Sequence, residues 1–236
     1  MKRREFLTTV IAVAAAAPVA KAAVINGAPA FPLGSTNEPD LIQAKDGALT
    51  FLSKDEANLV GAIADRLIPA DALSIGGKEA GCVEFIDRQL AGSYGRAASL
   101  YRLGRFINGT PEQGTQSRFT PADRYRLGLA GIEKHCQETF QKSFTELSGE
   151  QQDSVITELE KGAANVGAVP SKELFEQVLQ NVREGFLSDP IYGGNKGMAS
   201  WHMIGFPGAR YDFRDVIDLK GQRLNIAPVS LVDRTL

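Results

Sequence analysis

The chain has 236 residues, with 26 lysines and arginines against 28 aspartates and glutamates, so its formal net charge is −2 at pH 7. Removing the first 22 positions takes away four basic residues and one acidic residue, which leaves 22 basic against 27 acidic side chains. This acidic balance, without a block of basic residues, argues against binding to nucleic acid or to an anionic membrane surface. The remaining length is sufficient for one domain with a sizeable core.

The first residues predict an export signal. Arg3 and Arg4 are adjacent, Phe6 and Leu7 follow after one spacer, and an apolar run rich in alanine comes next. This order is typical of a twin-arginine signal, which exports proteins that are already folded and engages the twin-arginine translocase. The alternative is a general secretory signal whose basic region contains two arginines.

A cleavage site and an extended arm are expected after the apolar run. Ala20 and Ala22 are the small residues that a signal peptidase requires, so residues 1–22 are predicted to be removed after Ala22. The apolar run is shorter than the ~20 residues of a membrane span. Residues 23–50 contain three prolines and few large apolar residues, which predicts an extended arm that either wraps another surface or is disordered.

Helical signals dominate residues 51–236, and strand-like alternation is weak. We therefore predict an all-α fold, a single domain of about six helices. Helix starts are marked by capping residues, with Pro at the first helical position of one of them. These starts are Ser53 with Glu56, Thr120 with Pro121, Ser148 with Gln151, and Ser171. The predicted helices cover 53–68, 79–90, 97–107, 121–140, 148–159 and 171–188.

Within the third predicted helix, 97–107, the side chains expected to face inward are Leu100, Leu103 and Ile107. Two acidic–basic pairs on other helices, Asp65-Arg66 and Asp87-Arg88, are expected on polar faces, where solvated ion pairing is the ordinary role.

From residue 190 the composition changes to aromatic residues mixed with glycines, without a helical period. This pattern predicts an irregular C-terminal segment, which is either a loop packed on its own helices or a docking surface. The second interpretation rests on the large share of interface energy that aromatic and arginine side chains supply. The candidate docking residues are Tyr192, Trp201, His202, Phe206, Arg210 and Tyr211.

No catalytic residue, metal ligand or cofactor site is predicted in the chain. The signatures of c-type haem attachment, a dinucleotide cradle and a hydrolase nucleophile elbow are all missing from the sequence. The two histidines, His135 and His202, have no metal-specific spacing. We expect a structural or surface role for His135. For His202 we expect an interface or loop-stabilising role, with contact to a substrate or cofactor on a partner as the second possibility.

The two cysteines, Cys82 and Cys136, both fall on apolar helix stripes. Three alternatives are open: a bridge between them, a bridge from one of them to another subunit, or two buried thiols. An oxidising compartment favours pairing, and an internal bridge would add about 4 kcal/mol of stability in the chain-entropy description.

Several motifs resemble the small subunit of membrane-bound gluconate 2-dehydrogenase. The resemblance covers residues 52–215. Its most distinctive parts are the Arg-Leu-Ile-Pro run that ends at Pro69 and the block Ile204-Gly-Phe-Pro-Gly-Ala-Arg-Tyr211. The other matching runs are Lys78-Glu-Ala-Gly81, Phe85-Ile-Asp-Arg-Gln-Leu-Ala-Gly92, Tyr125-Arg-Leu-Gly-Leu129, Phe144-x-x-Leu147-Ser-x-x-Gln151 and Asp189-Pro-Ile-Tyr-Gly-Gly-Asn195.

The resemblance implies a three-part enzyme in which this chain carries no cofactor. A large FAD-dependent dehydrogenase subunit would oxidise a sugar or sugar acid, and a multihaem cytochrome c would pass electrons to quinone and anchor the complex. The small subunit would escort the flavoprotein through twin-arginine export and stabilise it. The expected location is the periplasm, attached to the inner membrane through the partner complex. Similar small subunits accompany dehydrogenases of several sugars, so the sugar itself is not specified.

The alternative is an exported α-helical enzyme that acts alone, with His202 paired to Asp212 or Asp215, or else a secreted binding module. An independent enzyme predicts turnover by the isolated chain. The small-subunit hypothesis predicts that a flavoprotein purifies with the chain.

Overall fold

The computed structural model describes residues 48–100, 102, 104–107, 109–113, 116–210, 212–222 and 224–231. All of them belong to the second of the chain's two units, Glu38–Leu236. The predicted leader with Arg3, Arg4, Phe6 and Leu7, the cleavage site at Ala20 and Ala22, and most of the predicted arm lie outside the described residues. So does Tyr211.

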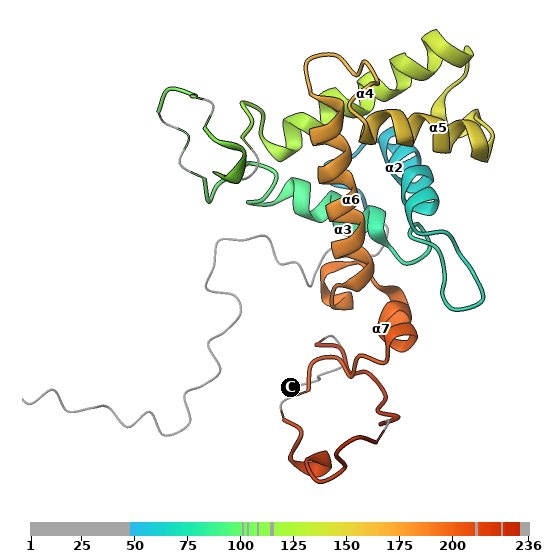
Figure 1. Ribbon diagram of the computed structural model, residues 1–236, viewed down its shortest axis with the longest axis vertical. Coiled ribbons are helices and arrows are strands. Elements are labelled where there is room, and N and C mark those ends of the chain that lie inside the picture. Colours follow the sequence, from blue (N-terminus) through green and yellow to red (C-terminus); the bar gives the residue numbers. More distant parts are fainter. Residues whose placement is uncertain are drawn as a thin grey trace, which may run out of the picture. The chain divides into compact units, whose positions relative to one another are not determined.

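The described residues form six α-helices, shown in Figure 1, joined by turns and single 3₁₀ turns. No strand occurs among these residues; one isolated bridge joins Gly208 to Val229. The predicted all-α class is confirmed. The helices are α2 (Lys54–Leu67), α3 (Cys82–Ala91), α4 (Pro121–Phe140), α5 (Gly149–Glu160), α6 (Ser171–Leu187) and α7 (Ala199–Ile204). No described helix has the length and apolar character needed to span a membrane.

Local capping signals position three of the helix starts. The Ser53 hydroxyl accepts a hydrogen bond from the Glu56 amide, and the Glu56 carboxylate accepts one from the Ser53 amide. The same reciprocal box forms between Thr120 and Asp123, and between Ser148 and Gln151. Each box satisfies amides that the first helical turn leaves unpaired, which is why these predicted starts are confirmed.

Helix α6 lies at the centre of the fold and contacts each of the other five helices. In Figure 1 it runs between α3, α4 and α5, with α7 beyond its C-terminal end. Burying Leu174, Val178, Val182 and Phe186 on one face supplies a large hydrophobic contribution to stability. Because α6 reaches from the main core to the C-terminal segment, it couples the packing of the two.

A polar cluster lies between α4 and α6. The hydroxyls of Tyr125 and Tyr94 both donate to the Asn181 side-chain oxygen, at 3.1 and 3.3 Å. Tyr125 and Asn181 are fully buried, so these bonds satisfy groups that would be costly to leave unpaired.

Asp87 ties the segment before α2 to α3. Its carboxylate is 1% exposed and accepts hydrogen bonds from the amides of Thr50, Phe51 and Leu52, at 2.7–2.9 Å, and from the Thr50 hydroxyl at 2.9 Å. The prediction that Asp87 lies on a solvated polar face is therefore wrong. Arg66 pairs instead with a residue of another helix, Asp153 of α5, through two bonds of 2.5 and 2.7 Å.

The predicted helix over 97–107 is also wrong. The described residues of this range lie in turns, bends and loops, and Leu100 and Ile107 are 63% and 76% exposed. Leu103 lies outside the described residues. Ala97 has φ 53°, in the left-handed region that interrupts a right-handed helix. With its apolar side chains facing solvent, the segment lacks the buried face that stabilises most protein helices.

Three further differences from the prediction concern α3, α6 and α7. Helix α3 begins at Cys82 rather than at residue 79, after Gly81 in the left-handed conformation. Ser171 is the first residue of α6 rather than its cap, and Pro170 occupies the cap position without a side-chain hydrogen bond. The segment after residue 190 is irregular as predicted except for α7, whose six residues carry too short a pattern for a period to be recognised.

Candidate functional site

The motif Asp189–Asn195 builds the connection between α6 and α7. Asn195 is fully buried, and its side-chain nitrogen donates a hydrogen bond to the Ser188 carbonyl at 2.9 Å. Its side-chain oxygen accepts from the amide and hydroxyl of Ser200, at 3.0 and 2.8 Å. One side chain therefore fastens the beginning of α7 to the end of α6.

Glycines let three backbone segments approach closely at this connection. A Cβ added at Gly194 would lie 2.1 Å from the carbonyl oxygen of Gly185 in α6. Gly81, at the start of α3, has φ 86°, and a Cβ there would lie 2.6 Å from the Gly193 oxygen. Neither position can carry a side chain without moving backbone. Close packing thus requires glycine at positions 194 and 81.

Trp201 holds α7 against the end of α6. Its indole N–H donates to the Leu187 carbonyl at 2.9 Å, and its ring meets Phe206 edge to face with centroids 5.1 Å apart. The side chain is 5% exposed. For Trp201 the structure therefore favours the interpretation of a loop packed on its own helices, because an indole whose N–H is bonded and whose ring is covered is a packing residue. Its role in docking stays a prediction.

The chain returns to this region at its C-terminal end. The Gly208–Val229 bridge is accompanied by a hydrogen bond from the Ala209 amide to the Val229 carbonyl, at 2.7 Å. The Ser230 hydroxyl and the Leu231 amide donate to the Asp189 carboxylate, at 2.8 and 3.0 Å. Asp189, which directly follows the predicted helix 171–188, thus fixes the returning chain.

Exposed apolar side chains lie on α7 and beside it, and we call them the C-terminal surface. Its members are Leu187, Tyr192, Met203, Ile204 and Phe206, which are 39–56% exposed. Of the predicted docking residues, Tyr192, His202 and Phe206 are exposed here. Arg210 is partly buried and pairs with Asp215 at 2.7–2.8 Å.

A groove between α3 and α6 adjoins this surface. It has a volume of about 810 Å³, and its wall is mainly apolar, with Glu176, Arg183 and Glu184 among the residues that line it. Leu187 and Tyr192 belong to both the groove and the C-terminal surface, and Phe85, Leu179 and Arg183 also line the groove. Apolar surface rimmed by polar groups is characteristic of protein interaction sites.

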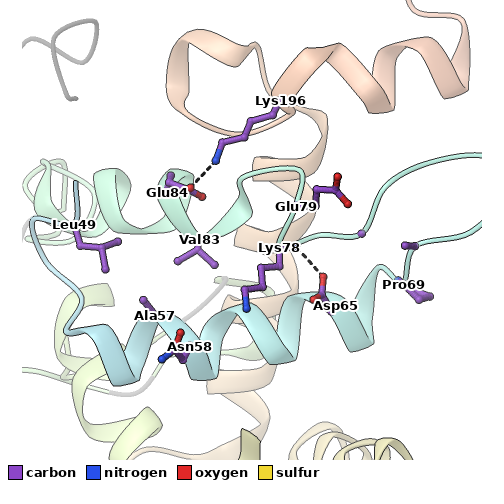
Figure 2. Close-up of a pocket in the computed structure, with 12 residues that line it drawn as sticks. Leu49, Ala57, Asn58, Asp65, Pro69, Lys78, Glu79, Val83, Glu84 and Lys196 are labelled. Atoms are coloured by element: carbon purple, nitrogen blue, oxygen red, sulfur yellow. Dashed lines mark hydrogen bonds and ion pairs between the residues drawn. The ribbon is translucent and has the colours of Figure 1, made fainter. Parts of the chain in front are cut away.

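A second groove, shown in Figure 2, lies between α2 and the start of α3. Its volume is about 710 Å³. Three of its charged groups are already engaged: Lys196 pairs with Glu84 at 2.6 Å, and the Asp65 carboxylate accepts a hydrogen bond from the Lys78 backbone amide at 2.9 Å. Among the described residues, no three histidine, cysteine or carboxylate side chains are grouped to hold a metal ion.

The carboxylates proposed to act with His202 are held by arginines. Asp212 pairs with Arg214 at 2.7 Å, and this hydrogen bond holds the pKa of the Asp212 carboxyl below its usual range. Asp215 pairs with Arg210. The other histidine, His135, is partly buried, and its Nε2 forms a hydrogen bond of 3.0 Å with the Glu158 carboxylate that joins α4 to α5.

Both cysteines are free and buried in the structure. The Cys82 thiol donates to the Val182 carbonyl at 3.4 Å. The structure thus has no bridge between Cys82 and Cys136, and a bridge from one of them to another subunit stays a prediction. Burial, with nearby carboxylates as a smaller cause, raises the pKa of Cys82 to about 12 and that of Cys136 to about 12.

We expect neither thiol of the native protein to react at an appreciable rate with a thiol reagent at pH 8, and both to react after denaturation. Between pH of about 8.5 and 12 the unfolded chain loses thiol protons that the folded chain keeps, so stability should fall as the pH rises. Reagent titration with and without denaturant, and unfolding at several pH values, measure the two effects. On a non-reducing gel, a band of a covalently linked species that disappears with reductant would instead show a disulfide bridge.

A family model for gluconate 2-dehydrogenase subunit 3 matches residues 54–208. The match begins at the first residue of α2 and ends at Gly208 of the bridge to Val229. It contains all six described helices, and it confirms the resemblance inferred from the motifs. Comparison with curated proteins and with solved structures found no match.

Proposed function

The chain belongs to the gluconate 2-dehydrogenase subunit 3 family, and on this premise we propose that it is the noncatalytic small subunit of a periplasmic sugar or sugar-acid dehydrogenase complex. The observation that carries the proposal is the family match over the whole helical core. In the proposed complex the FAD belongs to a large flavoprotein subunit and the haem c to a cytochrome subunit that attaches the complex to the inner membrane.

The proposed role is escort and stabilisation. Twin-arginine export moves folded proteins, and a flavoprotein that binds FAD in the cytoplasm must cross the membrane folded. The Arg3-Arg4 pair of this chain would then supply the export signal for both subunits. The C-terminal surface and the α3/α6 groove support this role because they offer apolar area for a stable association.

The alternative, an independent enzyme built on His202, is less well supported by the geometry. Asp212 and Asp215, its proposed partners, form ion pairs with Arg214 and Arg210. The oxygens of both carboxylates already accept hydrogen bonds from arginine guanidinium groups, so they are less available to orient an imidazole.

The test is purification of the full-length chain, tagged at its C-terminus and expressed in its own host with the neighbouring genes. We expect a protein containing FAD to purify with it, visible as yellow colour and as flavin released on denaturation. Dehydrogenase activity should follow the flavoprotein, and the chain separated from it should show none. A chain that purifies alone in full yield, stable and soluble, would contradict the proposal, as would turnover by the separated chain.

A further inference from the structure

The groove between α2 and the start of α3, which we call the α2/α3 groove, lies beside the first described residues. Asp87 holds the amides of residues 50–52. Arg126 of α4 donates to the Phe51 carbonyl, and its guanidinium carbon lies 4.3 Å from the centre of the Phe51 ring. Leu49, just before this tether, lines the groove. The chain that precedes Leu49 is therefore fastened at the groove.

The groove runs along α2 and has apolar side chains at both ends. Figure 2 shows Leu49 at one end, Pro69 at the other and Val83 between them. Leu49 and Pro69 are exposed. From Ala57 to the end of α2 at Leu67 the helix rises about 15 Å. An occupant that covers the apolar side chains must therefore extend over about this distance.

Residues 38–47, which we call the proximal arm, directly precede the first described residue. Their sequence is Glu-Pro-Asp-Leu-Ile-Gln-Ala-Lys-Asp-Gly. Leu41 and Ile42 are the nearest large apolar residues before Leu49, eight and seven positions away. Because an extended chain covers about 3.3 Å per residue, seven residues span up to about 23 Å. The apolar pair can therefore reach the far end of the groove without full extension of the chain.

Most charged groups of the groove are engaged, and two are not. Lys196 and Glu84 form an ion pair, and Asp65 accepts from a backbone amide. The side-chain charges of Lys78 and Glu79 are exposed and form no hydrogen bond or ion pair with the described part of the chain. An occupant of the groove therefore meets one unengaged cation and one unengaged anion.

The proximal arm carries charges of both signs. Its basic residue is Lys45, and its acidic residues are Glu38, Asp40 and Asp46. Lys78 and Glu79 can thus each meet an opposite charge, and the remaining carboxylates can stay in water. Exposed pairs of this kind contribute little energy. The charges are therefore compatible with the contact, and burial of the apolar pair supplies its stability.

From the tether, the reach and the composition of the arm we propose that the proximal arm folds back into the α2/α3 groove of its own chain. Leu41 and Ile42 then cover the end of the groove at Pro69 and Ala70. The proposal does not rest on the function proposed above. It differs from the sequence-based expectation of an arm that wraps another surface or is disordered, because residues 38–47 pack on the chain's own helices.

The chain's own segment fits the groove better than a separate partner. A short linker holds a tethered segment at an effective concentration in the millimolar range. A contact with a dissociation constant of about 0.1 mM, which is weak between separate proteins, then keeps the groove occupied for most of the time. Leu49 and the bonds of residues 50–52 to Asp87 provide this tether.

The test measures how fast a thiol reagent labels Ile42→Cys, with Phe31→Cys as the matched position farther along the arm. Peptide mass spectrometry assigns the label, and the labelling rate in denaturant is divided by the rate in the native protein. We expect this ratio to be roughly tenfold larger at position 42 than at position 31. The full-length chain is used as it is purified from its own host, both in any complex that it forms and after separation.

A second substitution locates the protection in the groove. Ala70→Arg, combined with Ile42→Cys, places a large charged side chain at the end of the groove and should make the two positions label alike. Ala130→Arg is the matched control, an exposed alanine of α4 that does not line this groove. It should leave position 42 protected. Protection that survives Ala70→Arg in a folded chain overturns the proposal.

Circular dichroism checks that the Ala70→Arg variant is folded. If it is not, the double variant Ile42→Cys with Ala70→Cys decides under oxidising conditions. A disulfide between the two positions within one chain, seen on a non-reducing gel and by mass spectrometry, supports the proposal. Absence of that disulfide overturns it.

Other occupants of the groove give distinct results. If position 42 is protected only in a complex with another protein, the arm packs on that partner and the proposal fails. If the protection in the separated chain is lost on dilution, the arm packs on a second copy and the proposal also fails. Equal labelling of positions 42 and 31 under every condition shows that the proximal arm does not occupy the groove. None of these results bears on the proposed function.

Discussion

Replacing Asp87 with alanine should lower the free energy of unfolding by about 3–5 kcal/mol, the largest stability loss that we expect from a single polar side chain of this protein. The substitution removes the acceptor of four hydrogen bonds, from the amides of Thr50, Phe51 and Leu52 and from the Thr50 hydroxyl. Detachment of residues 50–52 would let water hydrate their amides. It would also expose Leu52, which is 5% exposed and belongs to the core, so stability would still be lost.

Denaturant unfolding followed by circular dichroism measures this loss, and amide exchange locates it at residues 50–52. Asp218→Ala is the matched control: its carboxylate is exposed, and we expect a change within about 0.5 kcal/mol. Asp87→Asn should fall between the two, because one amide oxygen remains to accept. If Asp87→Ala unfolds within 1 kcal/mol of the wild type, the hydrogen bonds do not have the importance assigned to them here.

Asp87 also illustrates which parts of the fold the sequence reveals. The starts of α2, α4 and α5 are predicted correctly because a capping box involves residues three positions apart, so its signal is local. The role of Asp87 depends on Thr50, Phe51 and Leu52, which lie 35–37 positions away. The sequence of its own helix indicates only an ordinary surface carboxylate next to an arginine at position 87.

The failure over residues 97–107 has the same origin. Leu100 and Ile107 have helical spacing, but spacing stabilises a helix only where another element covers the apolar face. The structure leaves both side chains exposed. By contrast, α4 has the same kind of pattern and is helical to Phe140, because Tyr125, Leu129 and Ile132 are buried in the core.

The composition of the C-terminal segment predicted its irregular backbone but not the roles of its individual residues. Mixed aromatics and glycines correctly indicated irregular backbone held by large side chains. Which aromatic is buried and which is exposed depends on contacts between distant residues: Trp201 bonds to Leu187, whereas Phe206 remains 44% exposed. The need for glycine at position 194 likewise follows from its contact with Gly185, which no local pattern encodes.

Replacing Arg3 and Arg4 with lysine should strand the proposed flavoprotein partner in the cytoplasm. The substitution keeps both positive charges, so a general secretory signal would remain functional, whereas twin-arginine recognition distinguishes arginine from lysine. Because the flavoprotein would have no other route in the proposed complex, we expect its periplasmic amount to fall roughly tenfold or more while its total amount is retained or reduced by degradation.

Cell fractionation with flavin and dehydrogenase assays measures the distribution, and the small subunit is followed in the same fractions. Lys21→Arg, which also conserves charge but lies outside the arginine pair, is the control and should leave both distributions unchanged.

The two leader hypotheses give different pairs of results. If both proteins stay in the cytoplasm, the twin-arginine escort is supported. If the small subunit is still exported while the flavoprotein is left behind, the leader is a general secretory signal. If the flavoprotein reaches the periplasm normally, it does not depend on this chain's arginine pair and the escort role is excluded.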